Sequence, residues 1–209
     1  MSPVETNPEA SRGSDPDGDV IALVRAGEVS GAAERLMQRY GTAVYRYCRA
    51  ALRDATLADD VHQQVFLEAL RDLPRFAGRS LVRVWLFAIA RHRVLDAVKV
   101  RHRALDRFDD IEDLERAGPS DPRPSPIDAI DDARLYEVLV ACVDELDEAS
   151  RTAVLLHYQQ GFTFEAMAEI CGEKAGTLHA RVARAMPRLR RAIESQLHGD
   201  SGTLRRRAA

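Results

Sequence analysis

The sequence is poor in cysteine, with only Cys48, Cys142 and Cys171 among its 209 residues. An odd number at wide spacing argues against a disulfide framework, and no pair has the spacing of zinc ligands. This usage fits a reduced, cytoplasmic setting. The chain also lacks an apolar run of about 18 residues, so insertion into a membrane is not expected. Residues 1–18 are polar and acidic and lack the apolar core of a secretory signal, which predicts a disordered leader.

Strand signals and catalytic motifs are equally scarce. No stretch sustains the period-two alternation of a β-strand, so the sequence predicts an all-α protein. His62, His92 and His102 lie in the same half as several acidic residues, yet no H-E-x-x-H spacing occurs. A P-loop, a nucleophile elbow and a dinucleotide fingerprint are also missing from the sequence. We therefore expect no enzyme, no metal site and no cofactor.

The net charge of −3 hides a segregation of charge along the chain. Residues 75–107 hold nine Lys and Arg against two acidic residues, and residues 174–191 hold six against none. Residues 104–132 reverse the balance, with ten acidic residues against three arginines. Two basic blocks separated by an acidic stretch predict two anion-binding surfaces on one chain. For either block alone, an ordinary solvated helix face is the structural alternative.

Hydrophobic periodicity divides the chain into two domains. Apolar residues at helical spacing predict four helices in a first domain, residues 19–103, at about 20–27, 32–53, 57–70 and 80–103. Four prolines and the acidic run predict a flexible linker over residues 104–132. Helical periodicity returns in a second domain, residues 133–197, and residues 198–209 are expected to form a disordered tail. The prediction is two small helical domains, a bundle and a helix-turn-helix, on one flexible tether.

The strongest local motif lies in the second domain, over residues 161–184. Thr163 is placed to cap a helix, and Gly172 is placed to adopt the left-handed conformation of a tight inter-helix turn. Leu178 and Val182 then face the core. This pattern predicts a helix-turn-helix whose second helix enters the DNA major groove. A plain helical hairpin with an exposed basic face is the alternative.

Two further motifs lie in the first domain. In residues 57–70, apolar side chains including Leu70 face inward, while amides, Asp60 and Leu67 lie three or four residues apart on the other side. Such a face suits docking on another protein, although an amphipathic surface helix would look the same. In residues 76–93, a glycine-containing basic loop precedes an arginine-rich helix with aromatics, which suits single-stranded DNA. We expect Trp85 itself to be a core residue.

In this order, the three segments resemble the extracytoplasmic-function (ECF) group of bacterial RNA polymerase sigma factors. The resemblance covers residues 19–103, similar to region 2, and residues 133–195, similar to region 4. It implies a factor that binds core RNA polymerase through the β′ clamp coiled coil and the β flap, reads the −35 promoter element and melts the −10 element. It also implies an anti-sigma factor as a regulatory partner.

The resemblance assigns three sets of contact residues. The polymerase-binding set is Asp60, Gln63, Gln64 and Leu67. The set that binds −10 DNA is Phe76, Arg79, Ser80, Arg91, His92, Lys99 and Arg103. The set that binds −35 DNA is Lys174, Thr177, His179, Arg181, Arg184 and Arg188.

Two features depart from the family pattern or from ordinary helix chemistry. Glu173 replaces a proline or polar cap, and we expect it near DNA phosphates as a selector against some sequences. Pro187 interrupts a helical run, which predicts a bend or break near residues 183–187. A helix-turn-helix regulator that acts without polymerase is the alternative function, but it leaves the Asp60 and Trp85 segments without a role.

Overall fold

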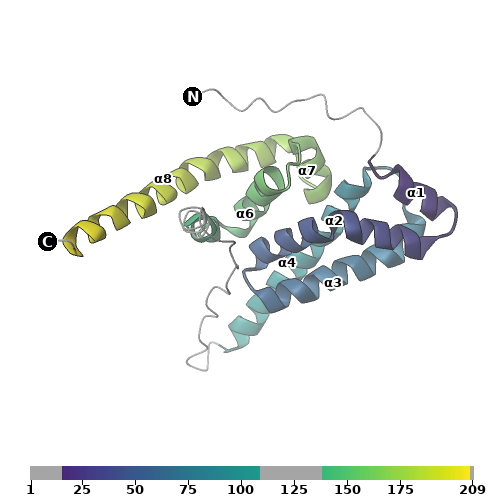
Figure 1. Cartoon of the computed structure of the whole chain (residues 1–209), viewed down its shortest axis with the longest axis horizontal. Helices are drawn as coiled ribbons and strands as arrows, with labels where there is room; N and C mark the ends of the chain where they lie inside the picture. The colour runs from purple at the N-terminus through teal and green to yellow at the C-terminus, as the bar shows by residue number, and fades with distance from the viewer. Residues whose placement is uncertain (1–15, 109–137, 208–209) are drawn as a thin grey trace.

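The computed structural model describes residues 16–108 and 138–207, with side chains described over 16–104 and 138–195. The first half contains α1 (Gly18–Arg25), α2 (Val29–Leu52), α3 (Ala55–Asp72), the short 3₁₀ helix η2 (Leu73–Arg75) and α4 (Val82–Phe108). The second half contains a helical stretch over 138–144, then α6 (Glu148–Val154), the π-helical turn η3 (Leu155–Gln159), α7 (Phe164–Cys171) and α8 (Ala175–Arg207). These described residues contain no strand, which confirms the all-α prediction (Figure 1).

The first half begins with a buried charge cluster. Asp17 is fully buried, accepts hydrogen bonds from the Tyr40 hydroxyl at 2.9 Å, and pairs with Arg39 at 2.7 Å. Asp19 meets the same guanidinium at 2.9 Å. A buried carboxylate is stable only when it is paired and hydrogen-bonded, so this cluster fixes the start of α1 against α2. Asp17 and Gly18 therefore do not belong to a disordered leader, and residues 1–15 lie outside the described part.

Capping residues define the other helices of the bundle. Arg53 ends α2 in the left-handed conformation at φ 60°, and Asp54 then caps α3 by accepting a hydrogen bond from the Leu57 amide at 3.0 Å. This two-residue connection makes α2 and α3 antiparallel neighbours, and α4 packs against both. Their facing stripes form the core of the bundle, including Leu36, Val44, Tyr47, Leu52, Val65, Leu86 and Phe87.

A buried arginine braces the second half. Arg151 donates to the backbone carbonyls of Leu146 at 2.7 Å, Asp144 at 3.0 Å and Val143 at 3.3 Å. Its guanidinium thereby holds the 138–144 stretch against α6. Burial lowers the pKa of Arg151 because it disfavours the charged form, and the three carbonyls compensate for part of that cost.

The two halves pack against each other instead of lying apart. One apolar cluster runs from α1–α4 into η3, α7 and α8, and α4 lies directly on α7. Figure 1 shows α6 and α7 beside the bundle, while the far end of α8 extends away from it. The prediction of two helical regions is confirmed, but their close packing was not foreseen.

Several predicted boundaries need correction. The α4 helix continues to Phe108, into the expected linker, and residues 109–132 of that linker lie outside the described part. Residues 198–207 continue α8, where a disordered tail was expected. The helix also passes through Pro187 without a break. Because Pro187 and Ala183 are exposed, water has access to the carbonyl that proline leaves without its helical partner.

The three cysteines are free and buried. Burial raises the pKa of the Cys48 thiol to about 12, so this residue stays a neutral, apolar core side chain at neutral pH. Within the described residues, no helix combines the length and the apolar character needed to cross a bilayer.

The turn before α8 yields a stability prediction. Gly172 has a φ of 65°, and a Cβ there would contact nothing within 4 Å, so Gly172→Ala introduces backbone strain without a clash. We expect a loss of about 1–2 kcal/mol in the free energy of unfolding. Gly176→Ala, inside the first turn of α8 and equally free of clashes, is the matched control and should be neutral or stabilising by up to about 1 kcal/mol. Thermal unfolding of both variants checks this, and equal shifts in Tm would contradict it.

Candidate nucleic-acid interfaces

The helix-turn-helix is formed by α7 and α8. The Thr163 hydroxyl accepts a hydrogen bond from the Ala166 amide at 3.3 Å and begins α7, and left-handed Gly172 ends it. Leu178 and Val182 of α8 are buried against the core. The predicted cap, turn and inward face are confirmed. This geometry leaves the opposite face of α8 open to solvent.

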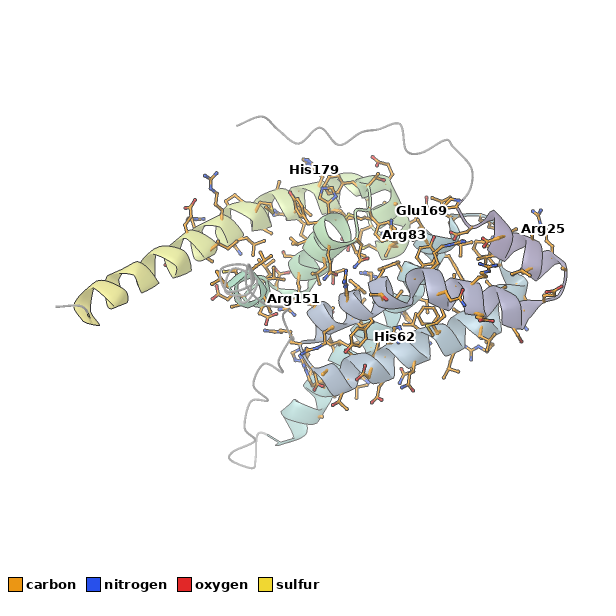
Figure 2. All side chains as sticks on the ribbon, in the orientation of Figure 1. Arg25, His62, Arg83, Arg151, Glu169 and His179 are labelled. Carbon is orange, nitrogen blue, oxygen red and sulfur yellow. The ribbon has the colours of Figure 1, made fainter. Side chains whose placement is uncertain are left out.

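Most of the predicted −35 residues lie on that open face. Lys174, Thr177, His179, Arg184 and Arg188 are all exposed. The Arg184 Nε donates to the Ala180 carbonyl at 3.1 Å, which holds its guanidinium along the helix. The His179 ring meets Phe164 edge-on, with ring centroids 5.0 Å apart, and lies on the side of the helix-turn-helix away from α1–α4 (Figure 2). The face presents positive charge and the His179 ring to solvent.

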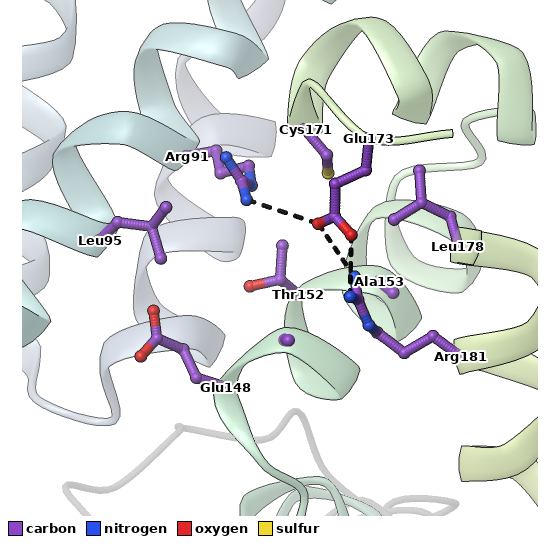
Figure 3. A pocket seen from close by; sticks show the side chains of 10 residues that line it. Arg91, Leu95, Glu148, Thr152, Ala153, Cys171, Glu173, Leu178 and Arg181 are labelled. Carbon is purple, nitrogen blue, oxygen red and sulfur yellow. Dashed lines mark hydrogen bonds and ion pairs between the residues drawn. The ribbon is translucent and has the colours of Figure 1, made fainter. Parts of the chain in front are cut away.

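Arg181 differs from its neighbours because it is held by an ion pair. Its two terminal nitrogens donate to the Glu173 carboxylate at 3.0 and 2.8 Å. These hydrogen bonds lower the pKa of Glu173 and raise that of Arg181. Glu173 also lies 3.9 Å from Arg91 of α4. The expected position of Glu173 beside phosphates is therefore not the one found in the free chain, where two arginines surround its carboxylate (Figure 3).

An aromatic pocket lies where α4 begins. It has a volume of about 480 Å³ and is lined by Asp72, Arg75, Phe76, Ala77, Arg79, Ser80 and Trp85. The rings of Phe76 and Trp85 lie against each other with centroids 5.1 Å apart. Trp85 is half-buried and packs against the core on one side, as expected of a core residue, but it also forms a wall of the pocket. Phe87, two residues further on, is fully buried in the core.

The remaining −10 candidates follow α4 away from this pocket. His92, Lys99 and Arg103 are exposed, and their spacing of seven and four residues places them on one stripe of the helix. Asp96 lies among them, 3.4 Å from His92 and 4.0 Å from Lys99. The structure therefore groups Phe76, Arg79 and Ser80 in one pocket, aligns three basic residues beyond it, and turns Arg91 toward α7.

The predicted docking face occupies α3. Asp60, Gln63, Gln64 and Leu67 are exposed, and Leu67 is 66% exposed. On the opposite side, Val61, Val65, Phe66 and Ala69 are buried. Leu70, expected to face inward, is 40% exposed and extends the apolar part of the outer face.

Comparison with known proteins identifies the family of the chain. The model for sigma-70 region 2 matches residues 36–104, and the model for sigma-70 region 4 matches residues 136–189. The ECF sigma factor SigC of Mycobacterium tuberculosis is 34% identical over 168 residues, which cover 79% of this chain and 85% of SigC. SigD of the same organism is 31% identical over 179 residues, covering 82% and 81% of the two chains. The chain belongs to the ECF family of RNA polymerase sigma factors.

Solved sigma factor structures share the fold. The sigma factor RpoE of Bartonella quintana, solved with the anti-sigma factor NepR, superposes with a TM-score of 0.65 at 22% identity, over 77% of this chain and 96% of RpoE. CnrH, solved with the cytosolic domain of CnrY, gives a TM-score of 0.59 at 25% identity, over 85% and 99% of the two chains. In this sigma factor, region 2 thus corresponds to the bundle with the pocket, and region 4 to the helix-turn-helix.

The contacts that join the two regions could not be predicted from the sequence. Arg83 stacks on Phe162, with its guanidinium carbon 4.3 Å from the ring centroid, and donates to the Gln160 carbonyl. Burial lowers the pKa of Arg83. No pattern in the sequence marks this arginine, because its partners lie 77 to 79 residues away. The one feature of the sequence that sets Arg83 apart from an ordinary surface arginine is its position within the basic block of residues 75–107.

The single tryptophan makes the pocket of region 2 observable. Because Trp85 lies against Phe76, we expect a single-stranded oligonucleotide that enters the pocket to change the intrinsic tryptophan fluorescence. Arg79→Ala should weaken this binding by about ten-fold at low salt, since it removes a charge at the pocket rim. Arg25→Ala, which removes an exposed charge at the end of α1, is the control and should bind as wild type does. If both variants weakened oligonucleotide binding equally, the affinity would depend only on the overall charge of the protein.

Proposed function

We propose that this sigma factor binds core RNA polymerase through the outer face of α3 and directs transcription initiation by reading two promoter elements with two separate surfaces. The pocket and basic stripe of region 2 hold the opened −10 strand. The exposed face of α8 reads the −35 duplex. The factor makes and breaks no covalent bond, needs no cofactor and works in the cytoplasm.

The exposed face of α3 supports the polymerase contact. Three polar side chains and one largely exposed leucine stand on a helix whose other side is anchored in the core. The Arg93–Glu68 ion pair ties α3 to α4, so the docking face and the −10 surface form one rigid unit. Such rigidity suits a factor that must position promoter DNA relative to an enzyme. On this proposal the β′ clamp coiled coil occupies the α3 face, and the β flap contacts region 4.

The pocket supports the melting step. A base that leaves the duplex loses its stacking and pairing, which costs a few kcal/mol. Stacking on an aromatic side chain returns about 1–3 kcal/mol per base, and phosphate contacts add a salt-dependent contribution. Phe76 and Trp85 supply the aromatic surface, and Arg75 and Arg79 supply charge at the same pocket. These groups are sufficient in kind to hold one extruded base.

The helix-turn-helix supports duplex recognition. The N-terminal residues of a recognition helix make the base contacts in this motif, and its flanking charges bind phosphates. Lys174 directly precedes α8, Thr177 and His179 lie in its first turns, and Arg184 and Arg188 follow along the exposed part of the helix. The first three are candidates for base contacts, and the two later arginines are candidates for phosphate contacts.

An anti-sigma factor is the regulatory partner that we propose. RpoE and CnrH were each solved with such a partner or with a partner's cytosolic domain. Their folds match this chain over both regions. A partner that covered the surfaces described above would block polymerase and DNA together.

The single observation that carries the proposal is the exposed stripe on α3, because a regulator acting without polymerase has no use for it. Asp60→Arg reverses one charge on this stripe and should lower affinity for core polymerase by at least about 100-fold, as expected when a like charge is forced into an interface. The fold should be unaffected, since Asp60 is exposed. Pull-down with purified core polymerase measures the effect, and circular dichroism checks the helicity.

Asp59→Arg is the matched control. It makes the same charge change at an equally exposed neighbouring position, about 100° further round the helix and off the stripe. It should retain binding within a few-fold. If Asp60→Arg binds like wild type, the α3 face is not the polymerase contact. If the wild-type protein fails to bind core polymerase but binds duplex DNA tightly, the result favours the alternative function, a helix-turn-helix regulator that acts without polymerase.

A further inference from the structure

An acidic side chain stands among the basic residues of the −10 pocket. Asp72 lines the cavity of about 480 Å³ together with Arg75, Phe76, Arg79 and Trp85. A pocket that only attracted phosphates would gain nothing from a carboxylate, because like charges repel each other. Unless Asp72 stabilises the fold, its carboxylate acts on a part of the DNA other than the backbone.

Asp72 does not stabilise the local fold in the usual way. It occupies the N-cap of η2, the position at which an aspartate accepts hydrogen bonds from the first helical amides. Its side chain makes no such hydrogen bond. Pro74, the second residue of η2, has no amide hydrogen, so one of the usual donors is missing. The carboxylate is thereby left available for another partner.

The contacts that Asp72 does make are weak. One carboxylate oxygen accepts a hydrogen bond from the Arg71 Nε at 3.4 Å, which is long for such a bond. The side chain is 39% exposed. Arg75 and Arg79 line the same pocket, but neither forms an ion pair with Asp72 within the part of the chain that the structure describes. The carboxylate can therefore accept further hydrogen bonds from a bound group.

A base that stacks on Phe76 and Trp85 presents its flat face to the rings and leaves its edge to the polar groups of the lining. The cavity has the size of a small-molecule site, so purines and pyrimidines both fit and size does not select between them. An ionised carboxylate accepts hydrogen bonds and donates none. Asp72 therefore distinguishes bases by the N–H donors on their edges.

The four bases differ in how many adjacent donors they offer. Guanine has two side by side, N1–H and the N2 amino group, which match the two oxygens of a carboxylate. Adenine and cytosine each have one amino group beside a ring nitrogen that is itself an acceptor. Thymine has a single N3–H between two carbonyl oxygens, which a carboxylate repels. The order of preference at such a group is guanine first, adenine and cytosine next, and thymine last.

We infer that Asp72 is a specificity-determining residue of the −10 pocket and that it selects guanine over thymine as the extruded base. The inference rests on the proposed function and deepens it, because it assigns the chemistry by which the pocket tells one base from another. The aromatic pair of Phe76 and Trp85 then holds any base, Arg75 and Arg79 attract the phosphates, and the carboxylate distinguishes the bases.

Titration of the full chain with short single strands tests the inference. In each strand only the central nucleotide carries a base and the others are abasic, so the fluorescence of Trp85 reports the binding of one base at a time. The wild-type protein should bind the guanine strand at least about ten-fold more tightly than the thymine strand at low salt, as expected for one well-formed pair. Equal affinity for all the strands would overturn the inference.

Asp72→Asn should change the order of preference as well as the affinity. An amide offers one donor beside one acceptor, which fits thymine and no longer matches the two donors of guanine. We expect the preference for guanine over thymine to fall by about ten-fold or more. The thymine strand should bind the variant at least as tightly as it binds wild type, a result that an unfolded variant cannot give.

Asp59→Asn is the matched control, because it removes one exposed carboxylate from the same helix, α3, at a position outside the pocket. It should keep the wild-type ratio of guanine to thymine affinity. If both variants shifted every strand by the same factor, Asp72 would contribute only charge and the inference would fail. If no strand bound the wild-type protein, the −10 part of the proposed function would fail with it, whereas binding without preference defeats the inference alone.

Discussion

The packing of α4 on α7 decides which arginines of this sigma factor are exposed to solvent and which face the other region. One stripe of α4 supplies Leu86 and Phe87 to the core of region 2, and Phe87 reaches on to Phe162 of region 4. The same helix carries the −10 pocket at its beginning and a basic stripe further along. Because α4 contributes to the core, the pocket and the contact with region 4, a substitution on one of its faces affects the other faces as well. The region interface is therefore coupled directly to the DNA surface.

The interface combines two kinds of interaction with different specificity. The aromatic contact of Phe87 with Phe162 is favourable because it removes apolar area from water, and it holds regardless of which solutes are present. The contact of Arg91 with Glu173 is electrostatic and long, at 3.9 Å, and the buried Arg91 Nε has no hydrogen-bond partner among the described residues. Apolar packing thus contributes most of the stability of the contact between the two regions, and the ion pair adds little to it.

The local structure of the protein could be predicted from its sequence because its causes are local. Hydrophobic periodicity placed the helices, and Thr163 and Gly172 marked the limits of α7 from a few neighbouring residues. The exposed stripe on α3 followed from the same spacing rule. At Pro187, however, the helix does not break, since an exposed backbone carbonyl has access to water and flanking residues such as Leu189 anchor the helix.

What could not be predicted depends on pairs that are distant in sequence. Arg83 meets Gln160 across 77 residues, and Gln160 meets Ala43 across 117. Periodicity identifies which face of a helix is buried, but it does not identify the partner that covers it. Trp85 illustrates the same limit at short range. Its aromatic character suited either a core or a base-binding wall, and only the position of the Phe76 loop decides between them.

Glu173 has a different relation to each of its two arginines, and this difference explains how one acidic residue can coexist with DNA binding. Its bidentate pair with Arg181 lies wholly within region 4. Within region 4, this pair fixes the orientation of Arg181. It also neutralises the negative charge of the Glu173 carboxylate, which would otherwise repel phosphates. The contact of Glu173 with Arg91 crosses between regions. The difference follows from the elements that carry the two arginines, because Arg181 lies on α8 of the same helix-turn-helix as Glu173, whereas Arg91 lies on α4.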